Sequence, residues 1–167
     1  MEIWDAYTAD GKRTGEDLYR GVRIPNGRFH MVCEVLLRHA DGDYLCMRRA
    51  ATKPIYPGRW EATAGGSALK GEEPIDCIKR ELKEETGLTG TDFRLLNRTV
   101  WEHNKCIYYT YLCSYDGPKD AIVLQAGETE GYRWMTEREF GAFARGGGMI
   151  PNQKRRYEAY FREQDIL

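Results

Sequence analysis

Apolar and polar positions along the first part of the chain predict a strand-rich segment. Phe29 to Arg38 is a mostly apolar run typical of a buried strand, and Asp41 to Asp43 predicts a turn into a second central strand, Tyr44 to Arg48. Lys53 to Gly66 contains prolines and glycines, which predict a loop and a short strand ending in a flexible glycine pair. Ahead of these strands, Met1 to Arg28 is polar and turn-rich, and predicts a β-ribbon that leads into the main sheet.

The middle of the chain predicts one helix, from about Glu73 to Thr86. Gly71 to Pro74 supplies the acids and the proline that suit a helix start, and Gly87 suits a left-handed cap at its end. Helical winding puts three apolar residues on one stripe, which must be buried against a sheet. These residues are Ile75, Ile78 and Leu82.

The last part of the chain predicts further strands followed by helices. Phe93 to Glu102 and Lys105 to Tyr115 alternate aromatic and β-branched residues, the pattern of a long antiparallel hairpin, and Tyr132 to Met135 predicts another short strand. Thr136 to Phe143 begins with a capping box, and Pro151 to Glu163 predicts a final helix. Strands separated by three helices indicate an α/β fold, a mixed sheet with helices on its faces.

Length and composition narrow the setting. The 167 residues suit a single domain, with residues 1–28 as the lead-in ribbon, 29–144 as the core and 145–167 as the C-terminal helix. Twenty-five basic residues nearly balance 26 acidic ones, so we expect no nucleic acid polymer and no membrane as partner. No signal peptide or membrane span is evident, and five cysteines without close pairs fit reduced thiols in a cytoplasmic protein. The oligomeric state stays open, a homodimer included.

Three carboxylates gather on one flank of the predicted central helix. Glu81, Glu84 and Glu85 are spaced so that they fall within an arc of roughly 100°. Like charges at this spacing destabilise a helix unless a cation neutralises them. Oxygen-only sites favour Mg²⁺ or Mn²⁺, and Mg²⁺ commonly takes its remaining ligands from substrate phosphates. A solvated acidic helix surface explains the same three residues, so the flanking pattern has to decide.

That flanking pattern resembles the signature of the Nudix hydrolases. Its fixed positions are Gly66, Glu72, Arg80, Glu81, Leu82, Glu84, Glu85, Gly87 and Leu88. The likeness extends through Pro57 to Glu61 before this segment and Arg133-Trp134 after it, over most of Phe29 to Phe143. The resemblance implies an α/β/α sandwich around a mixed sheet. It also implies Mg²⁺- or Mn²⁺-dependent hydrolysis of a diphosphate linkage in a small molecule such as a nucleoside-diphosphate derivative.

The resemblance also implies roles for individual residues. Glu81, Glu84 and Glu85 would bind the metal, with help from the backbone carbonyl of Gly65. Arg80 would orient these acids through an ion pair, while Glu72 braces the loop before the helix. Either Glu130 or Glu128 would supply a further ligand or the general base.

Substrate contacts are less specific in the sequence. Arg48 and Arg49 are candidates for gripping a phosphate, although strand alternation sends one of them to solvent. Trp60 is a candidate for stacking on a nucleobase, with packing in the core as the alternative. Lys154 to Arg156 predicts a solvated helix face.

Two other functions remain open. Arg28 to His30, Arg48 to Ala50 and Pro57 to Trp60 also resemble the isopentenyl diphosphate isomerases, a branch with the same fold. That branch uses a cysteine as acid or base, but Gly65 stands at its position here and Ser67 stands where a ligand histidine is expected. The second alternative is a non-catalytic module for a phosphorylated ligand, which would be expected to have lost some of the acids. The moiety attached to the diphosphate and the phosphorus attacked stay undetermined.

Overall fold

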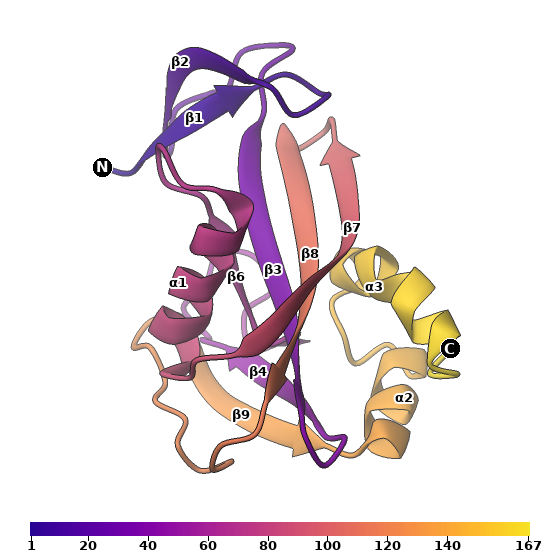
Figure 1. Ribbon diagram of the computed structural model, residues 1–167. Coiled ribbons are helices and arrows are strands. Elements are labelled where there is room, and N and C mark those ends of the chain that lie inside the picture. Colours follow the sequence, from indigo (N-terminus) through magenta and orange to yellow (C-terminus); the bar gives the residue numbers. More distant parts are fainter.

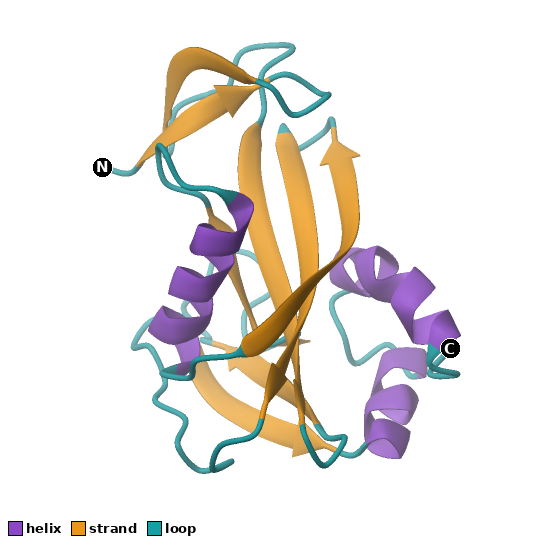
Figure 2. Cartoon of the chain, viewed as in Figure 1, coloured by secondary structure: helices purple, strands orange, loops and turns teal.

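The computed structural model describes residues 1–167, which form two sheets and three helices (Figures 1 and 2). At the N-terminus, β1 (Ile3–Tyr7) and β2 (Arg13–Tyr19) pair antiparallel as a separate two-stranded sheet, here called the N-terminal ribbon. The main sheet contains β3 (His30–His39), β4 (Tyr44–Arg49), β5 (Trp60–Glu61), β6 (Ala64–Ser67), β7 (Thr91–Trp101), β8 (Cys106–Tyr115) and β9 (Thr129–Met135). Its strand order is β5-β4-β3-β8-β7, with β6 also paired to β3 and β9 to β4.

The main sheet is mixed, as predicted. β3 and β8 run parallel over their whole length, from His30 opposite Cys106 to His39 opposite Tyr115. The other pairings are antiparallel, including the β7–β8 hairpin predicted from the sequence. β3 is therefore the central strand, and residues near its middle can reach either face of the sheet.

The three helices cover both faces of this sheet. α1 (Pro74–Thr86) begins after Glu73 and ends at Gly87, whose φ of 73° lets its amide bond to the Lys83 carbonyl. Figure 1 shows α1 on one face, with α2 (Glu137–Arg145) and α3 (Pro151–Glu163) on the other. The fold is thus the predicted α/β/α sandwich, and α2 begins with the predicted capping box at Thr136.

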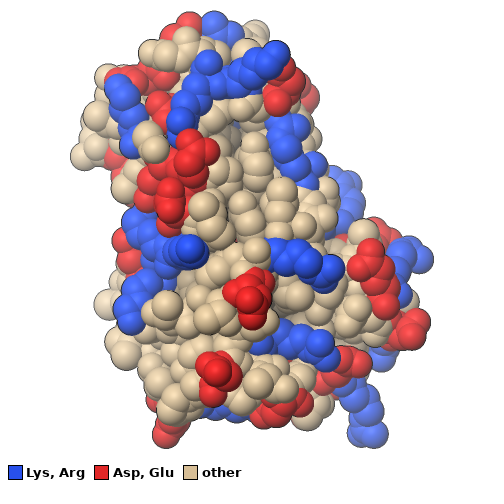
Figure 3. All heavy atoms as spheres, in the orientation of Figure 1, with Lys and Arg blue, Asp and Glu red and all other residues tan.

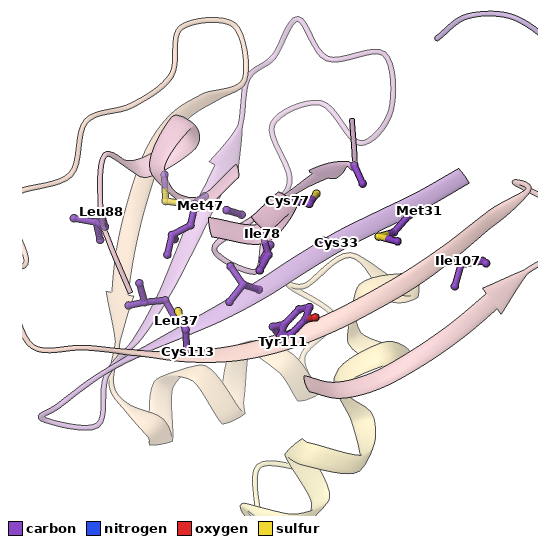
Figure 4. Close-up of a cluster of buried hydrophobic side chains, with 14 of the residues drawn as sticks. Met31, Cys33, Leu37, Met47, Cys77, Ile78, Leu88, Ile107, Tyr111 and Cys113 are labelled. Atoms are coloured by element: carbon purple, nitrogen blue, oxygen red, sulfur yellow. The ribbon is translucent and has the colours of Figure 1, made fainter. Parts of the chain in front are cut away.

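Side chains of the central strands alternate between two cores. Leu37 and Leu45 pack with the apolar stripe of α1, whereas Leu36 and Tyr44 pack with the C-terminal helices. Figure 4 shows the first of these cores, including Ile78 from α1 and Cys113 from β8. The apolar side chains that these strands direct toward α1 therefore hold this helix on one face of the sheet.

Two expectations from the sequence are wrong. The pair Gly65-Gly66 is not a flexible strand end, because it lies inside β6 and pairs with β3. A Cβ on Gly65 would approach the Cys33 carbonyl oxygen to 2.8 Å, so the backbones are too close for a side chain. Arg156 does not lie on a solvated helix face: it is buried and forms an ion pair with Glu34 of β3.

Other sequence features have simple outcomes. All five cysteines are free and buried. None of the helices is long and apolar enough to cross a membrane. On the face shown in Figure 3, basic and acidic side chains are interspersed, in keeping with the near balance of charge in the sequence.

Candidate active site

The carboxylates of α1 line a cavity of about 380 Å³ beside β6. Glu81 and Glu85 are buried, and Glu84 is exposed at its edge. The cavity also receives residues from the N-terminal ribbon, the β4–β5 loop and the segment before β9. Its polar lining comprises Glu2, Arg20, Lys53, Gly65, Gly66, Ser67, Arg80, Glu81, Glu84, Glu85, Gln125 and Glu128.

The glycines of β6 make room for these acids. A Cβ on Gly66 would lie 2.3 Å from the carboxyl carbon of Glu81, so this carboxylate occupies the place of a side chain. Gly65 also lines the cavity, next to the buried Glu85. The predicted meeting of Glu81, Glu84 and Glu85 beside Gly65 is therefore observed in the geometry.

Arg80 links the loop before α1 to the acids on the helix. Its Nε and Nη2 donate to the two carboxylate oxygens of Glu72, at 2.7 and 2.9 Å. Its Nη1 donates to Glu81 at 2.7 Å and to Glu84 at 3.2 Å. Glu72 in turn accepts the Leu69 amide at 2.8 Å, and the Arg80 hydrogen bonds lower the pKa of Glu72. Arg80 therefore contacts both the loop residue Glu72 and the helix acids Glu81 and Glu84.

The protein alone stabilises the ionised form of the buried acids poorly. Burial raises the pKa of Glu85 well above its usual value, and the neighbouring carboxylates of Glu61, Glu81 and Glu128 raise it further. Burial also raises the pKa of Glu81, although Arg80 opposes this shift. A cation bound among these groups would relieve both the burial penalty and the mutual repulsion.

The donor set fits a hard divalent cation. The acids and the glycine backbone offer oxygen ligands, which suit Mg²⁺ or Mn²⁺. The acids do not already surround a single point as a metal site would. Instead, the Arg80 guanidinium holds Glu81 and Glu84, so these side chains would turn toward an ion when it binds.

Of the two further acids, Glu128 lies in this cavity and Glu130 does not. The register of β4 and β9 shifts between Arg48 and Arg49, which pair with Gly131 and Thr129, so Glu130 is the unpaired residue of a bulge. Glu130 accepts the Ala51 amide at 3.0 Å and pairs with Arg48 at 3.3 Å. Glu128 instead faces the carboxylates and forms an ion pair with Lys53. The geometry favours Glu128 as the additional acid.

A second cavity, of about 260 Å³, also reaches Gly65. Its apolar lining includes Ile55, Tyr56, Trp101, Tyr108 and Ile150. Two ion pairs lie in its wall: Arg156 donates twice to Glu34 at 2.6 Å, and Arg49 contacts Glu61 at 3.0 Å. Burial raises the pKa of Glu61 to about 7.

The three residues predicted to contact the substrate therefore lie in different parts of the structure. Arg49 lines the second cavity, whereas Arg48 is exposed and donates to the Gly58 carbonyl at 3.3 Å. Trp60 packs against the core beneath α2 and α3 and lines neither cavity.

A comparison with known protein families identifies the family of this chain. A family model described as the NUDIX domain matches residues 28–156, most of the sequence. The chain belongs to the Nudix family. The family comprises hydrolases of nucleoside-diphosphate-linked compounds in general, and the signature segment of this Nudix protein is the one that builds the carboxylate cavity.

Individual relatives agree with this assignment. An uncharacterised Nudix hydrolase of Listeria innocua is 30% identical over 152 residues, which cover 90% of this chain and 89% of the relative. A relative from Listeria monocytogenes is also 30% identical, over 90% of this chain and 89% of its own length.

Solved structures share the fold. DR0079 from Deinococcus radiodurans superposes with a TM-score of 0.69 at 19% identity, covering 88% of this chain and 91% of that one. A NUDIX hydrolase from Nitrosomonas europaea gives a TM-score of 0.68 at 15% identity, over 86% of this chain and 74% of that one.

Sequence reasoning missed several lining residues of this Nudix protein. Glu2 and Arg20 come from the ribbon, far from the signature segment, and only the folded structure brings them to the carboxylates. A buried ion pair at Glu34 could have been expected from the sequence, because a charged residue inside a predicted buried strand requires a buried partner. The partner, Arg156, lies more than a hundred residues away on α3.

Proposed function

We propose that this Nudix protein is a Mg²⁺-dependent hydrolase of a diphosphate linkage in a small molecule, with Mn²⁺ as a substitute. The observation that carries the proposal is the gathering of Glu81, Glu84, Glu85 and Glu128 in one cavity against a strand of glycines. An acidic patch on a solvated helix would not bury two of its carboxylates beside a backbone shaped to receive them.

The proposed roles follow from the contacts. Glu81, Glu84, Glu85 and the Gly65 carbonyl would hold the metal, which when bound offsets phosphate charge and lowers the pKa of water. Arg80 orients Glu81 and Glu84, since it bonds to both. Glu128 would accept the proton of the attacking water, and its ion pair with Lys53 fixes its position.

The second cavity is the proposed place for the moiety attached to the diphosphate. Gly65 lines both cavities, and the second one combines aromatic walls with paired charges. Such a lining suits a flat, polar-edged group such as a nucleobase, with Arg49 at its wall. The isomerase alternative gains no support, since none of the five cysteines lines the carboxylate cavity. Five buried free thiols support a reducing compartment such as the cytoplasm.

A substrate screen tests this proposal. Dinucleotides, nucleotide sugars, nucleoside triphosphates and isoprenyl diphosphates are incubated with the protein and Mg²⁺, and products are followed by phosphorus NMR. We expect hydrolysis of at least one class, abolished by EDTA and restored by excess Mg²⁺. Full turnover in excess EDTA would refute the metal role. Conversion of isopentenyl diphosphate to dimethylallyl diphosphate would establish the isomerase, and Mg²⁺-dependent binding without turnover of any compound would establish the binding module.

A matched pair of variants tests the general base. Glu128→Gln and Glu130→Gln remove the same charge two residues apart, but only Glu128 lies in the cavity. We expect the rate to fall roughly a hundredfold or more in Glu128→Gln, within the range for general bases, and to stay near normal in Glu130→Gln. The reverse order would assign the role to Glu130.

A further inference from the structure

The N-terminal ribbon is docked on the loop that leads into α1. Polar contacts at about 2.8 Å or shorter join the two: the Lys70 amide to the Ile3 carbonyl, the Gly71 amide to Asp5, Arg13 to the Glu72 carbonyl and Glu73, and Lys70 to Asp17. Both strands of this ribbon lie outside the matched domain, which begins at residue 28. Its attachment to the signature loop fixes its position relative to the carboxylates.

The end of the ribbon where β1 begins and β2 ends lies at the carboxylate cavity. Glu2 precedes β1 and Arg20 follows β2, and both side chains line this cavity. Arg20 Nη1 donates to Glu2 at 2.6 Å, and 61% of the Arg20 side chain is exposed. An ion pair exposed to this degree stabilises the fold little, so Arg20 can exchange Glu2 for another anion.

Arg20 is the cation of this cavity that the fold uses least. Five carboxylates and three basic side chains line the space. Arg80 is committed to Glu72, Glu81 and Glu84, and Lys53 pairs with Glu128. The carboxylates of this cavity repel an anionic diphosphate, so its binding calls for a free cation in addition to a metal. A guanidinium suits phosphate oxygens, because it can donate two parallel hydrogen bonds to them.

We propose that Arg20 binds a phosphate of the substrate, releasing Glu2 to do so, and that the ribbon is therefore part of the substrate site. This inference rests on the proposed function, because it assumes that a diphosphate occupies the carboxylate cavity. Glu2 holds Arg20 in place before the substrate arrives and competes with the phosphate for it.

Binding of methylenediphosphonate, a P–C–P analogue that cannot be hydrolysed at the bridge, tests the inference without requiring turnover. Affinity with Mg²⁺ is measured by calorimetry for the wild type, Arg20→Ala and Arg28→Ala. Arg28 is the matched control, since it forms an exposed ion pair with Glu16 elsewhere on the N-terminal segment and does not line the cavity. We expect Arg20→Ala to weaken binding about tenfold or more, the loss typical of one hydrogen bond to a charged group, and Arg28→Ala to leave it unchanged.

Glu2→Gln provides a second readout that keeps Arg20 intact. Removing the competing carboxylate should tighten binding of the analogue by about two- to tenfold, since an exposed ion pair holds Arg20 only weakly. With a substrate from the screen, Arg20→Ala should raise KM and leave kcat within about threefold, because the contact serves binding.

The outcomes separate the two proposals. Wild-type affinity in Arg20→Ala, equal weakening in Arg28→Ala, or weaker binding in Glu2→Gln would each overturn the role of Arg20, while EDTA-sensitive binding and turnover would still support the hydrolase. If the wild type neither binds the analogue with Mg²⁺ nor hydrolyses any diphosphate, the proposed function fails and the role of Arg20 fails with it.

Discussion

Gly66→Ala is expected to remove activity while sparing the fold. The added methyl group would lie 2.3 Å from the Glu81 carboxyl carbon, whereas ordinary contact begins at 3.4 Å, so this carboxylate must move by about 1 Å. The group that must yield is the end of a flexible side chain, so the backbone can stay in place. A displacement of that size at a positioned catalytic group commonly lowers the rate about a hundredfold.

Gly65→Ala is the matched comparison, because its effect should fall on stability. A Cβ at Gly65 would approach the Cys33 backbone oxygen to 2.8 Å and the Glu34 Cβ to 3.1 Å. These atoms belong to the central strand and cannot turn away. Overpacking of this kind costs about 1–3 kcal/mol, which corresponds to a fall in melting temperature of roughly 3–10 °C for a chain of this size.

The assay compares kcat with Mg²⁺ and the melting temperature without metal for both variants. We expect Gly66→Ala to melt within about 2 °C of the wild type, because the exchange leaves the core unchanged, and to lose most of its activity. Normal turnover in Gly66→Ala would show that the position of Glu81 against β6 does not matter for the chemistry. A melting temperature lowered more in Gly66→Ala than in Gly65→Ala would refute the steric argument itself.

Two further predictions concern the buried polar groups. Arg156→Met leaves the buried Glu34 carboxylate without its ion-pair partner and should destabilise the protein by about 3–5 kcal/mol. Adding Glu34→Gln should recover part of this loss. Unchanged thermal unfolding of Arg156→Met alone would contradict the prediction. Burial lowers the pKa of His30 to about 4, so the folded state binds fewer protons than the unfolded state below pH 6.5, and stability falls as the pH drops toward 4. His30→Phe can keep the stack on Trp4, whose ring lies 4.4 Å away. Between pH 7 and 5, its free energy of unfolding should therefore fall by about 2 kcal/mol less than that of the wild type. Parallel pH profiles of the two unfolding free energies would count against this cause.

Local signals explain why the helices and hairpins could be predicted from the sequence. Pro74 and Gly87 mark the two ends of α1, and the Thr136 capping box marks the start of α2. The spacing of Glu81, Glu84 and Glu85 follows from helix geometry, so their shared flank needed no tertiary information. These features depend on residues within one or two turns of each other.

The remaining features depend on contacts between distant segments. The parallel pairing of β3 with β8 joins residues about 76 positions apart, as for His30 and Cys106, and no local pattern specifies it. The choice between Glu128 and Glu130 depends on a bulge in the pairing of β9 with β4, because a shift of one residue exchanges the faces of a strand. Arg20 reaches the cavity only because the ribbon docks on the signature loop.

The most direct test of the carboxylate site is the turnover of Glu84→Gln at saturating Mg²⁺, with a substrate found in the screen. Glu84 is partly exposed, and its main contact in the fold is a 3.2 Å ion pair with Arg80, so the exchange should change stability by less than about 1 kcal/mol. We expect kcat to fall roughly a hundred- to a thousandfold, because the site loses an anionic ligand and the electrostatic positioning that depends on it. A fully active Glu84→Gln with an unchanged melting temperature would contradict the account and return Glu84 to the solvated surface of the helix.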